Sequence, residues 1–288
     1  KPGCVVAVKV RHPGVEQRMH HDFILMERAA RTLCALPGLS ALRLDESIRQ
    51  FGGPLKEQLD LAVEAKHLTR FKHNFRLWPN VSFPTPLYPL VACDVLVETF
   101  EDGALMQKML RPVHLAANKH RSSLAETGLT CYLQMLLQDN FIHADLHPGN
   151  ILVRMEEPRK ANRGWAGWLQ ASLVRLPPKL ILLDTGMIAE LSKTDQANLV
   201  CFFKALTKQD GADLAEAILN MSERHTCQDP DSFVSDMELM FNTWDPEYIQ
   251  RNTSAVLSQM IDTVRQHGVT LRSAVSTVVV TTLVLEGW

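Results

Sequence analysis

The chain begins with two regular patterns of apolar and polar positions. Residues 5–10 (VVAVKV) alternate as a β-strand does and carry Lys9 among apolar neighbours. Residues 59–68 contain neither Gly nor Pro, and apolar side chains recur there at helical spacing, which predicts a helix with one inward stripe. The stripe consists of Leu61, Ala65 and Leu68. Glu64 flanks it, and taken alone would be interpreted as a solvated surface residue.

Later segments show helical periodicity with turn signals between them. Helices are expected over residues 14–36, 41–50, 124–139, 195–207, 212–221, 230–241 and 254–267. Residues 274–285 form the longest apolar stretch, which is shorter than the roughly 20 residues that span a bilayer. We interpret it as a buried element rather than a membrane anchor, and a position at a membrane interface stays open. Together these elements predict an α+β fold whose second part is mostly helical.

Residues 143–153 read HADLHPGNILV, and DTG follows at residue 184 behind an apolar run. Phosphoryl transfer needs a carboxylate that orients the nucleophile and hard oxygen ligands that hold magnesium against phosphate groups. Asp145 is the candidate catalytic residue, and Asn150 and Asp184 are the candidate magnesium ligands. The pattern predicts an ATP-handling, kinase-like fold.

The histidines of this motif admit other interpretations. His143, Asp145 and His147 alternate as zinc ligands can. A zinc site would leave Asn150 and Asp184 without a role, which favours the kinase-like interpretation. His143 suits a structural histidine behind the loop. His147 either approaches the transferred phosphate as part of the nucleotide site or caps the turn, and the sequence leaves both roles open.

A kinase-like fold also gives the early elements a function. It needs a strand lysine that reaches the α and β phosphates and a helix glutamate that holds this lysine in place. Lys9 and Glu64 occur in that order along the chain, so we expect them to form a pair at the nucleotide site.

Residues 94–103 (DVLVETFEDG) run from a strand into a polar turn and suit a hinge between two lobes. Backbone groups of Glu98, Thr99 and Phe100 are expected to bond adenine. Val97 is expected at the back of the nucleotide pocket. The support for this assignment is the order of the parts, since any edge strand followed by a turn would look similar.

These motifs resemble those of the UbiB or AarF-domain atypical kinases, a family associated with coenzyme Q biosynthesis. The likeness covers most of the chain and rests on residues 6–15 (VAVKVRHPGV), the helix around Glu64 and residues 143–150 (HADLHPGN). The resemblance implies a bilobal protein-kinase-like fold, bound ATP or ADP with Mg²⁺, and an ATPase or a small-molecule or lipid phosphotransferase activity. It also implies a mitochondrial location and a membrane lipid or quinone precursor as a further partner.

The resemblance further implies a division into two lobes. Residues 1–100 would form a partial small lobe with an extra helical region and the hinge, and residues 101–288 the large lobe with the catalytic loop and the DTG. Residues 154–179 form an insert in the catalytic hairpin. Because nothing before the Lys9 strand resembles the phosphate-covering loop of the family, we expect a small lobe truncated at its N-terminus.

Three positions depart from kinase patterns. Gln58 stands where the family usually has the glutamate of a Glu-x-Asp pair, completed here by Asp60, so the metal stoichiometry can differ from the family's. Thr185 stands where protein kinases carry Phe. Ala144 replaces the arginine that precedes the catalytic Asp in kinases regulated on the activation loop, which disfavours activation by phosphorylation.

These departures keep other functions open. Gln58 and the missing phosphate-covering loop favour a catalytically weak pseudokinase scaffold of a membrane-associated complex. A third hypothesis is an aminoglycoside-type phosphotransferase, since that group shares a similar catalytic loop.

Composition narrows the partners. The formal net charge of −2 gives no electrostatic case for binding nucleic acid. The six cysteines are widely separated with no Cys-x-x-Cys, which fits reduced thiols. The insert either touches an anionic membrane surface or has no partner, and both interpretations stay open. The residues that suggest a membrane contact are Arg154, Arg159, Lys160, Arg163, Trp165 and Trp168. The sequence leaves any protein partner unknown.

Overall fold

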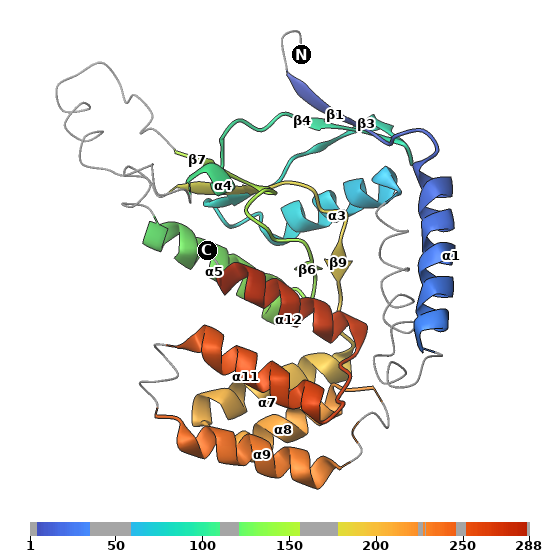
Figure 1. Cartoon of the computed structure of the whole chain (residues 1–288). Coiled ribbons are helices and arrows are strands. Elements are labelled where there is room, and N and C mark those ends of the chain that lie inside the picture. Colours follow the sequence, from blue (N-terminus) through green and yellow to red (C-terminus); the bar gives the residue numbers. More distant parts are fainter. Residues whose placement is uncertain are drawn as a thin grey trace, which may run out of the picture. The chain divides into compact units, whose positions relative to one another are not determined.

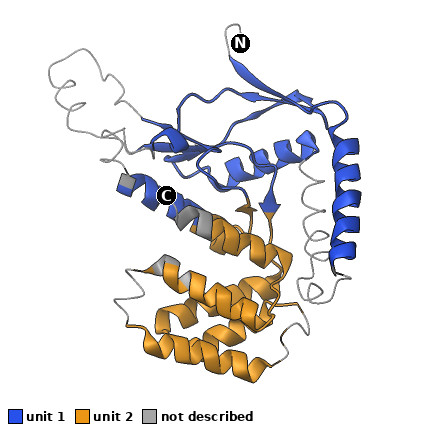
Figure 2. Cartoon of the chain, viewed as in Figure 1, with its two compact units in different colours: residues 1–132, 145–188, 288 blue, residues 133–144, 189–287 orange. Residues whose placement is uncertain are grey.

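The computed structural model of the chain describes residues 5–34, 59–109, 121–155, 178–223, 227, 229–245 and 252–286. The chain forms two compact units (Figures 1 and 2). The first comprises residues 1–132, 145–188 and 288, and the second comprises residues 133–144 and 189–287. The lobe boundary near residue 100 that the sequence suggests stays a prediction.

The first unit contains a three-stranded antiparallel sheet with the order β1–β4–β3. Its strands are β1 (Val6–Val10), β4 (Val95–Thr99) and β3 (Pro86–Val91). Lys9 of β1 lies opposite Leu96 of β4, and Leu96 is fully buried. The face of the sheet that carries Lys9 is therefore the inner one, and β1 confirms the strand that the alternation of residues 5–10 predicts.

Helices α1 (Val15–Cys34) and α3 (Leu61–Asn74) also belong to this unit and confirm two predicted helices. The Asp60 side chain caps α3 by accepting a hydrogen bond from the Ala62 amide at 2.9 Å. α3 packs against β3 and β4 through the predicted apolar stripe. Glu64 is buried within this stripe, unlike the surface glutamate that its sequence position alone would indicate. The helix predicted at 41–50 lies outside the described residues.

The second sheet of this unit has the order β2–β8–β7–β5. Its strands are β2 (Val81–Ser82), β8 (Lys179–Leu182), β7 (Ile151–Arg154) and β5 (Ala104–Leu105). β7 and β8 form an antiparallel pair in which Ile151 lies opposite Leu182. Helix α4 (Met106–Met109) follows β5 and contacts β7, and helix α5 (Arg121–Leu133) ends at the boundary of the unit.

The β7–β8 pair changes the boundaries of the predicted insert. Arg154 and Lys179, taken from the sequence as its first and last residues, are strand residues that lie opposite each other. Residues 156–177 lie outside the described residues, and so do most of the basic and Trp side chains predicted to contact a membrane.

The second unit is mostly helical. Its elements are the π-helical segment η3 (Gln134–Gln138), β6 (Ile142–His143), α7 (Lys193–Lys208), α8 (Gly211–Asn220), α9 (Pro230–Thr243), α11 (Thr253–Gln266) and α12 (Ser273–Glu286). The short strand β9 (Ile188–Ala189) crosses the boundary between the units. These helices confirm the four predicted between residues 195 and 267, and α12 forms from the apolar stretch. The helix predicted over residues 124–139 is instead α5 followed by η3.

The core of the second unit lies among α7, α8, α9 and α11. Its buried members are Ala205, Leu214, Ala215, Ile218, Phe233, Met237, Phe241, Val256, Met260 and Val269. Three acceptor side chains cap the first turns of α7, α8 and α9, namely Ser192, Asp210 and Asp229. Buried Asp195 forms an ion pair with Arg272, so this unit also contains an internal charge pair.

The described helices include none that is both long and apolar enough to cross a membrane.

Candidate functional site

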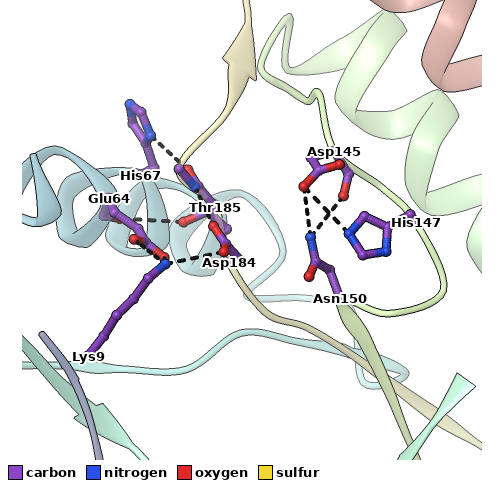
Figure 3. Close-up of polar contacts among 9 residues, drawn as sticks. Lys9, Glu64, His67, Asp145, His147, Asn150, Asp184 and Thr185 are labelled. Atoms are coloured by element: carbon purple, nitrogen blue, oxygen red, sulfur yellow. Dashed lines mark hydrogen bonds and ion pairs between the residues drawn. The ribbon is translucent and has the colours of Figure 1, made fainter. Parts of the chain in front are cut away.

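Lys9 lies at the centre of a group of charged side chains in the first unit (Figure 3). Its Nζ is 2.8 Å from Oε2 and 3.0 Å from Oε1 of Glu64, so both carboxylate oxygens accept from one ammonium group. The same Nζ lies 3.2 Å from Oδ2 of Asp184. The pair expected between Lys9 and Glu64 is present, and Asp184 joins it.

The pKa values of this group follow from burial and neighbouring charges. Burial lowers the pKa of Lys9, but the charges and hydrogen bonds of Glu64 and Asp184 outweigh it, so the pKa lies above its ordinary value. Burial raises the pKa of Glu64, and the Lys9 charge only partly offsets this. Lys9 therefore stays cationic at physiological pH and can attract an anionic ligand.

The segment that carries Asp184 is tied to α3. The Thr185 side chain is fully buried, and its Oγ1 donates to the Glu64 carbonyl at 3.4 Å. The His67 ring, one helical turn after Glu64, has its Nδ1 2.9 Å from the Thr185 carbonyl. The Asp184 backbone has φ of 40°, a left-handed conformation that Asp tolerates better than most residues. A small polar residue fits position 185 because its hydroxyl is buried and bonds the backbone of α3.

A second group of side chains comes from the loop before β7 (Figure 3). Asn150 Nδ2 donates to Oδ2 of Asp145 at 3.0 Å and to the Asp145 carbonyl at 3.3 Å. His147 Nε2 lies 3.6 Å from the same Asp145 oxygen. The Asp145 carboxylate is therefore oriented by the amide that follows it five residues later, and about half of its side chain remains exposed.

His147 serves the turn itself. Its Nδ1 accepts a hydrogen bond from the Gly149 amide at 3.0 Å, which leaves the proton of the neutral ring on Nε2, towards Asp145. A Cβ at Gly149 would lie 2.7 Å from the His147 ring, so glycine allows this close approach. The structure shows the turn-capping contact, and a contact with phosphate stays a prediction. His143 is fully buried in the second unit.

The β7–β8 pair brings the two groups to one edge of the second sheet. Asn150 directly precedes β7, and the Leu183 amide donates to the Asn150 carbonyl at 2.8 Å. Asp184 follows Leu183, so Asn150 and Asp184 leave the same end of two neighbouring antiparallel strands. One amide oxygen and one carboxylate are thus available at this edge as hard donors for a cation.

The hinge segment differs from expectation at Val97. Side chains alternate along β4, and Val97 lies opposite Val8 on the face away from Lys9. The structure therefore does not bring Val97 to the Lys9 face. Glu98 lies opposite Ala7, which shares the face of Lys9, so the side chain at 98 points where the sequence placed the one at 97.

Some backbone groups of this segment already form hydrogen bonds within the protein. The Thr99 amide donates to the Thr85 carbonyl at 3.0 Å, and Thr99 Oγ1 accepts from the Thr85 amide at 2.9 Å. Phe100 follows the strand and is 55% exposed. Of the three residues expected to bond adenine through the backbone, Thr99 already uses its amide within the sheet.

Glu98 has the most perturbed carboxyl group of this face. Burial, followed by the nearby negative charge of Glu64, raises the pKa of Glu98 to about 7, while Lys9 acts in the opposite direction. The sequence missed this side chain, because its direction depends on which residue of β1 lies opposite it. Strand parity would reveal it once the register is known.

Arg154 fixes the segment that follows β4. Its Nε donates to the Asp102 carbonyl at 2.7 Å, and its Nη2 donates to Glu101 Oε2 at 2.8 Å. A Cβ at Gly103 would lie 3.1 Å from the Leu152 side chain, so this segment runs close against β7. Arg154 therefore positions the candidate hinge. Gln58, which the sequence singles out, lies outside the described residues.

Comparison with known sequences agrees with this arrangement. The profile of the ABC1 atypical kinase-like domain matches residues 1–218. A probable serine/threonine-protein kinase, abkC, from Dictyostelium discoideum is 30% identical over 335 residues, which cover 99% of this chain and 48% of the relative. The mitochondrial ABC1 family protein YPL109C of Saccharomyces cerevisiae is 29% identical over 312 residues, covering 98% and 48%.

The chain thus spans about half the length of these relatives. Among solved structures, the complex of Rv3197 with erythromycin from Mycobacterium tuberculosis matches with a TM-score of 0.54 and 17% identity. That match covers 99% of this chain and 68% of the other. The expected α+β, kinase-like fold is confirmed, and the expected mitochondrial location agrees with the name of the yeast relative.

Proposed function

Since the chain belongs to the ABC1 atypical kinase-like family, we propose that it binds ATP or ADP with Mg²⁺ and moves a phosphoryl group to water, a small molecule or a lipid. The observation that carries this proposal is the contact of one lysine with two carboxylates. Lys9 is held by Glu64 and reaches Asp184, so a phosphate-binding cation and a metal-binding carboxylate lie side by side.

The donor atoms suit magnesium. Mg²⁺ prefers a few hard oxygen ligands from the protein and completes its shell with phosphate oxygens and water. Asp184 offers a carboxylate that is 48% exposed, and Asn150 offers its amide oxygen because its Nδ2 is engaged with Asp145. The described ranges contain no cluster of three or more His, Cys, Asp or Glu residues that could hold a metal ion by itself. Phosphate oxygens and water would therefore have to complete the shell of a bound magnesium. Bound magnesium would neutralise charge on the phosphates.

Asp145 is the proposed base. Its carboxylate is fixed by the Asn150 amide and remains partly exposed, so it can accept the proton of an attacking hydroxyl or water. Lys9 would hold phosphate oxygens, and Glu64 would keep Lys9 in place when Asp184 turns to the metal. His147 would stabilise the turn that presents Asp145.

The wider role follows from the relatives and remains part of the proposal. A mitochondrial location is supported by the name of the yeast relative. Resemblance to UbiB proteins supports a role in coenzyme Q biosynthesis or mitochondrial lipid metabolism. A small molecule, a lipid or water is the favoured acceptor, because the sequence after Asp184 has no Ala-Pro-Glu segment of the kind that supports peptide substrates.

Nucleotide binding and turnover by the full-length protein test the proposal. We expect ATP affinity that falls at least about tenfold without Mg²⁺, and an Asp184→Asn variant that has lost this magnesium dependence. Asp145→Asn should keep nucleotide affinity and lose about 100-fold or more in turnover. Asp262→Asn, at an exposed position of α11, is the matched control and should behave as wild type.

A pseudokinase scaffold is the second candidate. Gln58 favours it, since a neutral side chain stands where the family usually has a glutamate of its Glu-x-Asp pair. Equal nucleotide affinity in wild type and Asp184→Asn, with no turnover in either, would support the scaffold over the enzyme.

A further inference from the structure

We propose that the solvent face of α3 binds the surface of a lipid bilayer that contains anionic phospholipids. This basic face consists of Lys66, Arg70 and His73 on the helix and of Arg76 and Leu77 in the turn that follows. The binding needs no nucleotide, so it goes beyond the proposed function and can be tested separately from it.

The first support is the distribution of charge along the chain. No Asp or Glu occurs from residue 65 to residue 93, and the same stretch contains Lys66, Arg70, Lys72 and Arg76. The formal net charge of the whole chain is −2, so positive charge is concentrated in this stretch. A local excess of basic side chains on a nearly neutral chain indicates an anionic partner.

The second support is the direction of these side chains. Lys66, Arg70 and His73 recur at spacings of four and three, which places them on one face of the helix, and all three are exposed. The acid of this helix, Glu64, belongs to the buried stripe. Among the described residues, no carboxylate forms an ion pair with Lys66, His73 or Arg76. The exposed face of α3 is therefore positive, with no carboxylate of the helix on it.

The third support is an apolar side chain at the end of this face. Leu77 is 81% exposed, more than any other large apolar residue of the described ranges. It stands between Arg76 and Trp78, whose ring packs edge-on against Phe75. At the boundary of a bilayer an aliphatic side chain can enter the acyl region while neighbouring cations bind the phosphates. A bilayer therefore accounts for both the charge and Leu77, whereas the phosphates of a nucleic acid account for the charge alone.

Helix α9 shows the opposite combination and supplies a matched comparison. It also exposes a leucine, Leu239, at 64%. The helix contains Asp231, Asp236 and Glu238 and has no Lys or Arg. An acidic face of this kind is repelled by anionic lipids. Leu239 therefore serves as a control for Leu77.

Flotation of the full-length protein with vesicles measures the binding. We expect the wild type to bind vesicles of phosphatidylcholine with about 30% phosphatidylglycerol at least about tenfold more tightly than vesicles of phosphatidylcholine alone. Sodium chloride at about 0.5 M should weaken the binding, because salt screens charges at a surface.

Two variants test the two parts of the basic face. Lys66→Gln combined with Arg76→Gln should lower the affinity for the anionic vesicles about tenfold or more, since each basic residue near such a surface contributes about fivefold. Leu77→Ser should lower it about fivefold through loss of apolar contact. Lys204→Gln combined with Lys208→Gln on α7, and Leu239→Ser on α9, remove the same chemistry from exposed positions elsewhere and should bind as wild type.

Three results would overturn the inference. The first is a wild type that does not bind the anionic vesicles. The second is vesicle binding that neither the charge variant nor Leu77→Ser weakens. The third is binding of a duplex oligonucleotide that the charge variant loses and Leu77→Ser keeps, which would assign the face to nucleic acid. ATP affinity measured on the same preparations reports on the proposed function by itself, and all of these variants should keep it.

Discussion

At the scale of single residues, the charged groups of the first unit are more tightly coupled than their positions in the sequence indicate. Lys9 serves Glu64 and Asp184 at once, and the field of these carboxylates extends to Glu98 on the neighbouring strand. An uncompensated carboxylate on such a face makes the fold sensitive to pH, because its ionised form is disfavoured when the chain folds.

Glu98 shows the clearest case of this cost. Its pKa rises from 4.5 to about 7 on folding, so the folded chain binds the proton more tightly than the unfolded chain. The stability that this proton contributes is complete below pH 4.5 and is lost as pH rises through about 7. Because more than a third of the Glu98 side chain stays exposed and solvent screens its charge, Glu98→Gln should raise the free energy of unfolding by about 1–2 kcal/mol more at pH 8.5 than at pH 5.

Urea denaturation of wild type and variant at both pH values measures this difference. Glu238→Gln, an exposed position on α9, supplies the control and should show no such pH dependence. A variant that is no more stable than wild type at pH 8.5 would show that the Glu98 carboxylate is solvated.

The sequence identifies a site residue most easily when its partners lie close to it along the chain. Asp145, Asn150 and the DTG at 184 belong to short motifs whose chemistry is written locally, and they were found. The direction of Glu98 depends on strand pairing with residues about 90 positions away, and Thr185 meets Glu64 across more than 100 positions. Contacts of this kind leave no periodic signal.

At the scale of helices and strands, periodicity predicted most elements, and local caps set their ends. Asp60, Ser192 and Asp210 each bond the first turn of the helix that follows. Patterns were less informative where packing decides, as at η3, where a π-helical segment replaces the end of a predicted α-helix. The close approach of α8 and α9 was equally invisible, although a glycine marks it.

Gly211 is the residue at which α8 approaches α9 closely. A Cβ at this position would lie 2.6 Å from the Met237 carbonyl oxygen on α9, a rigid backbone atom. Gly211→Ala should force the two helices apart and lower the free energy of unfolding by about 1–3 kcal/mol, even though Ala favours helix formation. Thermal and urea denaturation measure the loss. Glu216→Ala, at an exposed position of the same helix, should change stability by less than about 0.5 kcal/mol.

At the scale of the whole molecule, the chain consists of two units with separate cores. The proposed nucleotide site draws its charged side chains from the first unit alone. Stability of the second unit can therefore be changed without removing any group that would touch the nucleotide.

The ion pair between Asp195 and Arg272 tests this separation. Asp195 is buried, and its carboxylate accepts a hydrogen bond from the hydroxyl of Ser192, the N-cap residue of α7. Its removal would leave Arg272 without a carboxylate partner. Asp195→Asn should cost about 2–4 kcal/mol, since the guanidinium would lose a charged partner. Hydrogen exchange should quicken in peptides from residues 193–286, while the affinity for nucleotide measured at low temperature stays within about twofold. If hydrogen exchange also became faster in α3 and β7, the two cores would be shown to unfold together.

One helix links the two ends of the charged group in the first unit. The Glu64 carboxylate of α3 forms an ion pair with Lys9. The Glu64 carbonyl and the His67 ring of the same helix contact Thr185, which directly follows Asp184. Turning or sliding this helix would loosen the ammonium and the neighbouring acid in one movement. In the proposed site, binding of a phosphate by Lys9 and binding of a cation by Asp184 would therefore be coupled, and interactions that hold α3 in place would favour both.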